Sequence, residues 1–265
     1  MSRQRANIRL FVDQDLEQGR EIAVGDDRAH YLTRVMRLQP GDSLRLFNGR
    51  DGEWLARISA VGRSGCALLL EAFLRGQRVE PGPVLAFAPI KKNRMHYLVE
   101  KATELGVERL LPVVTRNTVA DRVNLDRMRA QAIEAAEQCE RLTIPEVDAA
   151  KPLDRLVSEW QTHRPLLFTD ERGCGRPIAD AIADCVSRSD GSPLLPGILV
   201  GPEGGFAADE ADALRALAFV TPVSLGPRIL RAETAALAAL ACWQAFAGDW
   251  RAANRGERAN VRTES

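Results

Sequence analysis

Two short segments near the end of the chain combine glycines with charged residues at places where strands are expected to end. They are VGPEGGF (200–206) and SLGPRILRAETA (224–235). Each follows an apolar run and precedes a helical pattern, which predicts a loop between a strand and a helix. Glycines leave backbone N–H and C=O groups open to a ligand at the carboxyl edge of a sheet. This arrangement favours a nucleotide-like cofactor.

The spacing of the glycines argues against a cofactor with phosphate groups. A P-loop needs Lys followed by Ser or Thr after its last glycine, and a dinucleotide fingerprint needs glycines at its first, third and sixth positions. GPEGGF has glycines at its first, fourth and fifth positions and no lysine. Glu203 also lies among these glycines, where its carboxylate would repel a pyrophosphate. The two loops therefore predict a cofactor without phosphates.

The two loops resemble the signature pair of the SPOUT methyltransferases, in particular the family that methylates N3 of a uridine in 16S ribosomal RNA. The likeness continues upstream, in family order, through residues 30–54, 91–92, 97–107 and 134–141. The resemblance implies S-adenosylmethionine as cofactor and a trefoil-knotted, parallel-sheet α/β methyltransferase domain. It also implies an N-terminal RNA-binding β-barrel similar to the PUA domain, and a homodimer with sites near the subunit interface.

The cofactor is expected to lie against the backbones of both loops and against apolar walls. A strand that ends near residue 169 is expected to add to the same edge. Glu203 would face the positive charge or the hydroxyls of the cofactor, or would simply be a carboxylate favoured by a helix macrodipole. The predicted cofactor residues are Phe168, Thr169, Val200, Gly201, Glu203, Gly204, Gly205, Leu225, Gly226, Ile229, Leu230 and Thr234.

Arg231 and Glu233 are the predicted catalytic residues. Uridine N3 is a poor nucleophile until its proton leaves, so a nearby arginine would stabilise the developing anion and a carboxylate would accept the proton. Arg231 is expected to contact the base or its phosphate, and Glu233 to act as the base or to orient another group. The alternative is that Glu233 and Thr234 cap the last helix.

Six cationic residues are predicted to contact RNA, and for the first five the alternative is a solvated surface or, near residue 30, a helix cap. Two lie on the polar side of a helix expected over residues 30–38. Three lie at the start of another helix, where positive charge opposes the macrodipole. The last lies on a long helix, where it shares either an internal polar network or an RNA surface with Glu134, Glu137 and Gln138. The set is Arg34, Arg37, Lys91, Lys92, Arg94 and Arg141.

The elements that would position these residues fall into two predicted domains. Residues 1–78 contain short apolar runs separated by turn signals, which favours a small β-barrel. Residues 79–250 alternate strand and helix, which predicts a mainly parallel sheet. The helix over 233–247 is apolar on most sides and is expected to be buried, with a dimer contact as its use. Residues 251–265 are expected to form a disordered tail.

Composition adds few constraints. The 265 residues have a formal net charge of zero, yet 32 of the 36 basic residues are arginine, which suits phosphate contacts or reflects a codon bias. Five cysteines without a CxxC pair and three scattered histidines predict neither a disulfide framework nor a metal site. No apolar run approaches the roughly 20 residues that span a bilayer. Without a signal-like segment, the expected location is the cytoplasm.

Two other functions stay open at this stage. The first is a ribose 2′-O-methyltransferase of the same superfamily, because the cofactor loops do not define the acceptor. The second is a non-catalytic RNA-binding or ribosome assembly protein, which intact loops disfavour. One local departure is also visible, since Ala207 and Ala208 follow GPEGGF where related sequences have Ser or Thr. A lost hydroxyl cap costs about 1 kcal/mol unless Asp209 takes over its role.

Overall fold

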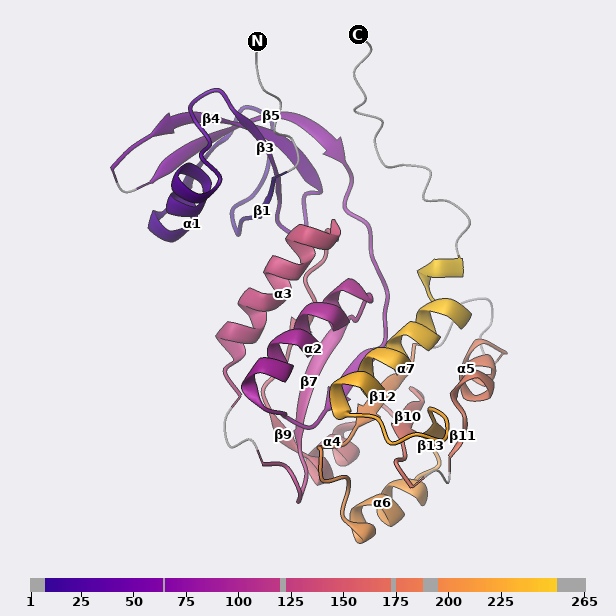
Figure 1. Ribbon diagram of the computed structural model, residues 1–265. Coiled ribbons are helices and arrows are strands. Elements are labelled where there is room, and N and C mark those ends of the chain that lie inside the picture. The colour runs from indigo at the N-terminus through magenta and orange to yellow at the C-terminus, as the bar shows by residue number, and fades with distance from the viewer. Residues whose placement is uncertain (1–7, 64, 120–122, 173–174, 188–194, 252–265) are drawn as a thin grey trace. The chain divides into compact units, whose positions relative to one another are not determined.

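The structure is a computed structural model that describes residues 8–63, 65–119, 123–172, 175–187 and 195–251. Of these, residues 8–79 and 136–144 form one compact unit, and residues 80–135 and 145–251 form another (Figure 1). The predicted tail begins at Arg251, which ends the short 3-10 helix Asp249–Arg251. Its other residues, 252–265, lie outside the described residues.

The first unit contains a five-stranded sheet in the order β1-β3-β4-β5-β2. Its strands are β1 (Arg9–Phe11), β2 (Glu21–Val24), β3 (Ser43–Phe47), β4 (Glu53–Val61) and β5 (Cys66–Arg75). Neighbouring strands are antiparallel except β1 and β3, and the predicted Asn-Gly turn joins β3 to β4 with Gly49 at φ +79°. Alternate residues such as Leu44, Leu46, Ile58 and Leu68 are fully buried and form the core, as period-2 patterning predicts.

The helix predicted over residues 30–38 is present in a different form. Helix α1 spans Asp26–His30, and Tyr31–Val35 continues it as a π-helix, with Met36 N donating to Tyr31 O at 2.9 Å. The wider turn breaks the α-helical spacing, so Leu32 is buried while Val35 is 60% exposed. Arg34 and Arg37 are exposed, as the predicted polar side requires.

The second unit contains a sheet whose neighbouring strands are all parallel, which confirms the predicted α/β class. The order is β11-β13-β10-β12-β6-β7-β8, and β9 also pairs with β7. The strands are β6 (Val84–Phe87), β7 (Arg109–Val114), β8 (Glu146–Val147), β9 (Lys151–Pro152), β10 (Leu166–Thr169), β11 (Arg176–Pro177), β12 (Gly197–Val200) and β13 (Val220–Ser224). This order agrees with the knotted fold that the resemblance implies.

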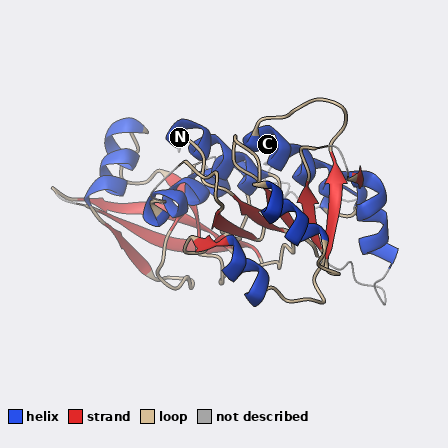
Figure 2. Ribbon diagram, turned by 90° about the horizontal axis from the view of Figure 1, so that it is seen from below, coloured by secondary structure: helices blue, strands red, loops and turns tan. Residues whose placement is uncertain are grey.

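Six helices of the described chain accompany these strands. The central strands are buried on both faces, so helices must cover both faces of the sheet. The helices are α2 (Lys92–Glu104), α3 (Leu125–Cys139), α4 (Leu153–Glu159), α5 (Ile178–Ser187), α6 (Ala208–Arg215) and α7 (Ala232–Phe246). Strands β6, β10 and β12 are buried at every position, as expected for central parallel strands. Val84 and Ala86 share a core with residues of α4 and α6. Figure 2 shows helices on both sides of the strands.

Helix α7 is buried along most of its length and packs beside α2 (Figure 1). Gln244 is 3% exposed, and its Nε2 donates to Leu105 O at 2.7 Å, which satisfies a carbonyl at the end of α2. Gly106, at φ +78°, ends α2 as the sequence predicts. None of the helices within the described residues is long and apolar enough to cross a membrane.

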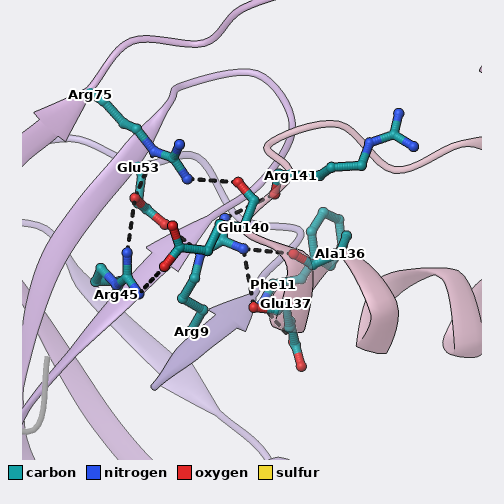
Figure 3. A network of polar contacts seen from close by, with 9 residues as sticks. All are labelled: Arg9, Phe11, Arg45, Glu53, Arg75, Ala136, Glu137, Glu140 and Arg141. Carbon is teal, nitrogen blue, oxygen red and sulfur yellow. Dashed lines mark hydrogen bonds and ion pairs between the residues drawn. The ribbon is translucent and has the colours of Figure 1, made fainter. Parts of the chain in front are cut away.

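A buried arginine holds the first unit together (Figure 3). Arg9 is 5% exposed, and its Nε donates to Glu53 Oε1 at 2.5 Å. Its two terminal nitrogens donate to the carbonyls of Ala136 at 2.6 Å and Arg141 at 2.8 Å. The guanidinium lies 4.3 Å from the centre of the Phe47 ring. Burial lowers the pKa of Arg9, and the Glu53 carboxylate opposes that shift. The end of α3 is thus tied to β1 by charge-assisted hydrogen bonds.

Replacement of this buried cation is expected to destabilise the protein strongly. Arg9→Met removes the donors to three carbonyls, those of Ala136, Glu137 and Arg141, and one partner of Glu53, a loss of about 3 kcal/mol for a broken buried pair. Arg57→Met is the matched control, because Arg57 and its partner Glu71 have side chains 41% and 33% exposed, and such pairs contribute at most about 1 kcal/mol. The urea midpoint is the measurement, and equal shifts in the two variants would contradict this account.

Candidate active site

A cavity of about 350 Å³ lies at the carboxyl ends of β10, β12 and β13. Both predicted loops line it, together with the residues that follow β10 and with Arg94 from α2. Its lining includes the predicted residues Thr169, Val200, Gly201, Glu203, Gly205, Leu225, Gly226, Ile229, Leu230 and Arg231. It also includes Arg94, which was predicted as an RNA contact, and residues that sequence analysis did not select, namely Asp170, Glu171, Pro202, Val223, Ser224, Arg228, Ala232 and Ala235.

Four selected residues do not belong to this lining. Phe168 is fully buried, and its ring lies edge-on to that of Phe206 with centroids 5.0 Å apart. It therefore packs against the end of the first loop and does not face the cavity. Gly204, Glu233 and Thr234 also fall outside the lining. Thr169 does line the cavity, but its hydroxyl donates to Leu199 O at 3.0 Å and is already in use.

Glycine is required at two points of the first loop. A side chain at Gly201 would place its Cβ 2.6 Å from the Phe206 ring. Gly205 has φ +66°, and a Cβ there would lie 2.3 Å from Glu171 Oε1. Because that carboxylate accepts a hydrogen bond from Phe206 N at 3.2 Å, it is held in place. The loop therefore depends on close backbone packing at both glycines.

The segment after β7 anchors the first loop, a role that sequence analysis missed. Asn117 Nδ2 donates to Gly205 O at 3.1 Å. The Arg116 guanidinium binds both carboxylate oxygens of Asp209 at 2.7 and 2.6 Å, which lowers the pKa of Asp209. β7 ends at the same sheet edge as β12, and the polar run TRNT at 115–118 was the available signal.

Helix α6 starts without a hydroxyl cap, and the carboxylates of Asp209 and Glu210 both accept backbone hydrogen bonds there. Ala207 N donates to Glu210 Oε2 at 3.0 Å, which is one half of a capping box. Glu210 Oε1 accepts from Arg116 N at 2.9 Å. The Asp209 carboxylate binds Arg116 and also accepts backbone hydrogen bonds from Asp209 and Glu210, which fits the suggestion that it takes over the cap.

An internal ion pair supports the cavity wall after β10. Asp170 is 5% exposed, and its Oδ2 accepts from Arg215 Nη2 at 2.5 Å and Nε at 2.9 Å. The hydrogen bond to Asp170 raises the pKa of Arg215. The pairing neutralises the buried carboxylate and fixes the strand end against α6.

Arg94 lies between two carboxylates at the wall of the cavity. Its Nη1 is 3.6 Å from Glu203 Oε1, and its Nε is 3.6 Å from Glu233 Oε1. Glu233 is 8% exposed, and its buried Oε2 has no hydrogen-bond partner among the described residues. Helix α7 begins after Arg231 without a side-chain cap hydrogen bond, so the capping alternative is not what the structure shows. This geometry fits Glu233 as a residue that orients Arg94.

A second cavity, of about 860 Å³, adjoins the first and shares Arg94 and Glu203 with it. The predicted residues Lys91 and Lys92 line it, so the structure brings three of the selected cations together. The rest of the lining, which includes residues of α3, was not predicted: Pro89, Ile90, Met95, Val119, Val123, Asn124, Arg127, Met128 and Gln131.

The three selected arginines of the first unit lie in different settings. Arg34 lines a cavity of about 590 Å³ together with His30 and Arg63. Arg37 is exposed and has φ +55°, an uncommon conformation for a residue other than glycine. Arg141 is 8% exposed, and its Nη2 donates to Thr143 Oγ1 at 3.0 Å. The internal polar network is thus the alternative that fits Arg141, and the predicted RNA contact is not supported.

Within the described ranges, no group of three His, Cys, Asp or Glu side chains is placed to hold a metal ion. The candidate site therefore consists of two adjoining cavities and of Arg94, which lies between the carboxylates of Glu203 and Glu233. An exposed arginine, Arg231, lines the first cavity.

Comparison with protein families and curated proteins gives consistent matches. The family described as "RNA methyltransferase domain" matches residues 80–244, and the one described as "RNA methyltransferase PUA domain" matches residues 24–71. The chain is 35% identical over 234 residues to the ribosomal RNA small subunit methyltransferase E of Rickettsia conorii, covering 88% of this chain and 93% of that protein. It is 34% identical over 215 residues to the protein of the same name from Synechocystis, covering 80% and 69%.

Solved structures match over nearly the whole chain. A putative methyltransferase from Legionella pneumophila, in complex with the bound cofactor SAM, has a TM-score of 0.77 at 28% identity, covering 90% of this chain and 97% of that one. A ribosomal RNA small subunit methyltransferase E from Neisseria gonorrhoeae, bound to S-adenosyl methionine, has a TM-score of 0.75 at 25% identity, covering 92% and 99%. The predicted fold class, a SPOUT domain with an N-terminal PUA-like domain, is confirmed.

The role of Glu210 can be separated from that of Asp209. Glu210→Ala removes the carboxylate that accepts from Ala207 N and Arg116 N, so it is expected to cost about 1 kcal/mol of stability. Asp209→Ala removes an exposed ion pair and the acceptor for the N–H groups of Asp209 and Glu210, which water can replace at this exposed position, so it is expected to have a smaller effect. Thermal unfolding of both variants checks this order. An Asp209→Ala effect as large as that of Glu210→Ala would contradict it.

Proposed function

The chain belongs to the RNA methyltransferase family that includes the ribosomal RNA small subunit methyltransferases E, and from this we propose that it methylates N3 of one uridine in small-subunit ribosomal RNA. The enzyme is S-adenosylmethionine-dependent, like the family members whose structures contain that cofactor. The main support within this chain is the glycine-loop cavity, which has a cationic and an anionic side chain beside the place where a methyl group would be transferred. Uridine N3 requires both charges in order to react.

The residues of the first cavity fit S-adenosylmethionine. Ile229 is 91% exposed in the lining, and an adenosine group beside it and Leu230 would cover this apolar surface. The carboxylates of Glu171 and Glu203 suit the positive charges of the cofactor. When bound, the cofactor supplies an electrophilic methyl group on a sulfonium. The loops would hold that methyl group in line with the acceptor nitrogen.

Arg231 is the proposed electrostatic catalyst. It is exposed at the first turn of α7 and lines the cofactor cavity. There its guanidinium would donate to a uracil carbonyl oxygen and stabilise the negative charge that develops as the N3 proton leaves. Glu233 is the proposed positioning residue, because its contact in the described structure is with Arg94.

RNA contacts are proposed for both units. Lys91 and Lys92 are exposed at the start of α2, which has no acidic residue in its first turn. In the first unit, Arg34 and Arg63 line one cavity and suit phosphate groups. We place the protein in the cytoplasm, where small ribosomal subunits are found.

A homodimer is proposed from helix α7. Leu237, Ala238, Ala241 and Cys242 form an apolar stripe at helical spacing that is only half-buried, and Phe246 continues it at 49% exposed. A second copy of the chain would cover this stripe. The adjacent residues at the start of α7 would then bring the cofactor cavity close to the subunit interface.

The reaction is tested with small ribosomal subunits from cells that lack this protein. Labelled S-adenosylmethionine is expected to yield 3-methyluridine, identified by mass spectrometry, with the wild-type enzyme. Arg231→Ala is expected to lower kcat about 100-fold, the typical effect of losing one donor to a developing anion. Arg155→Ala, on an exposed face of α4, is the matched control.

Arg34→Ala combined with Arg63→Ala is expected to raise KM for the subunits and leave kcat unchanged.

Other products would point to the other functions. A 2′-O-methylated nucleoside would show that the enzyme is a ribose methyltransferase. Absence of label in any ribosomal RNA, from a folded protein that binds the cofactor in calorimetry, would mean that the proposed substrate is wrong.

The dimer is tested by sedimentation. The wild-type protein is expected to sediment at twice the mass of one chain, and Ala241→Glu to sediment as a monomer because it places a charge in the apolar stripe. Ala130→Glu makes the same exchange at an exposed position of α3 and is expected to stay dimeric. A wild-type monomer, or a dimer that survives Ala241→Glu, would rule out this interface.

A further inference from the structure

The second cavity adjoins the proposed cofactor cavity and is the larger of the two. We propose that it receives the target uracil after that base has turned out of the RNA, and that Glu203 accepts the proton from N3. This inference rests on the proposed function and identifies where its substrate binds. The observations concern the floor of the cavity, its rim and its shared wall.

The floor is apolar and could contact the face of a base. Ile90 and Met128 are 3% and 2% exposed, and Met95 of α2 lines the same space. Gln131, 8% exposed, adds an amide whose N–H groups suit a uracil carbonyl. Enzymes that act on a base take it out of the stack and hold it between apolar side chains with hydrogen bonds to its edge.

The rim is cationic on two sides. Lys91 and Lys92 approach from α2, and Arg127 approaches from α3. All three are exposed, and none of them forms an ion pair among the described residues. Positive charges at the start of α2 oppose its macrodipole, so their placement is explained by an anionic ligand. The phosphates that flank a turned-out nucleotide supply that charge.

The shared wall provides the chemistry. Arg94 and Glu203 line both cavities, so a base edge that meets them from the second cavity lies beside the cofactor cavity. Arg94 would donate to a carbonyl next to N3 while Glu203 approaches the N3–H group. Glu233 lines neither cavity, and its Oε2 is buried, so it is not placed to take a proton from substrate. It acts through Arg94.

Methyl transfer to N3 exchanges one bond at each reacting atom. The N3–H bond breaks, and its proton passes to the Glu203 carboxylate. The electron pair left on N3 forms the new bond to the methyl carbon. The bond between that carbon and sulfur breaks, its electrons stay on sulfur, and the sulfonium charge is removed. Arg94 and Arg231 offset the charge on the uracil carbonyl oxygens while the proton leaves.

The proton acceptor is tested by Glu203→Gln, which keeps the shape of the side chain and removes its basicity. With small ribosomal subunits as substrate, kcat is expected to fall about 100-fold or more. The remaining rate is expected to rise about tenfold per pH unit in the alkaline range, because only uridine that has already lost its proton then reacts. The wild-type rate is expected to be flat over the same range. Glu104→Gln is the control, because it makes the same exchange in α2 at a residue that pairs with Lys101 and lies outside both cavities.

The cavity itself is tested by Met95→Trp, which fills it from α2. KM for the subunits is expected to rise at least tenfold, while the dissociation constant for S-adenosylmethionine in calorimetry stays within twofold. Tyr97→Trp is the matched control, because Tyr97 lies on the same helix, is 47% exposed and is outside the lining.

The outcomes separate this inference from the function it rests on. If the wild-type enzyme makes no 3-methyluridine, the proposed function fails. If it makes 3-methyluridine and Met95→Trp methylates with an unchanged KM, the second cavity is not the acceptor site. If Glu203→Gln keeps the wild-type kcat, or loses rate without the new dependence on pH, Glu203 is not the proton acceptor.

Discussion

The active site depends on one guanidinium held between two carboxylates. Arg94 lies 3.6 Å from both Glu203 and Glu233. Without it, two negative charges would face each other at the edge of a partly buried cavity, where Coulomb interactions are stronger than in water. The arginine offsets both charges and holds both carboxylates in place. It also fixes three segments to one another, because the three residues belong to α2, to the first loop and to α7.

Those three segments meet only because of the order of the strands. β6 leads into α2, β12 leads into the first loop, and β13 leads into the second loop and α7. In the parallel sheet, β6 lies beside β12, and β10 lies between β12 and β13. Their carboxyl ends therefore share one edge, and residues more than 100 positions apart, such as Arg94 and Glu233, come into contact.

The sequence could predict the parts of the site that are local. Glycine positions, apolar runs and helix starts lie within short windows, so the two loops and most of their lining residues were identified. Arg94 was selected as an RNA contact, because its neighbours in sequence are cationic and its partners lie in other elements. The floor from α3 was missed for the same reason. The π-helical turn after α1 was missed because it changes the period on which the pattern depends.

The zero net charge of the chain is compatible with an RNA substrate because charge is arranged locally. Many acidic residues are paired within the protein, as Asp209 is with Arg116 and Asp170 with Arg215. Such pairs cancel each other at distances beyond a Debye length of about 8 Å. The exposed cations at the second cavity are not neutralised in this way, so they dominate the field that an approaching phosphate meets. The field near this cavity therefore depends on which cations have no ion-pair partner among the described residues, and the net charge of the chain does not reveal it.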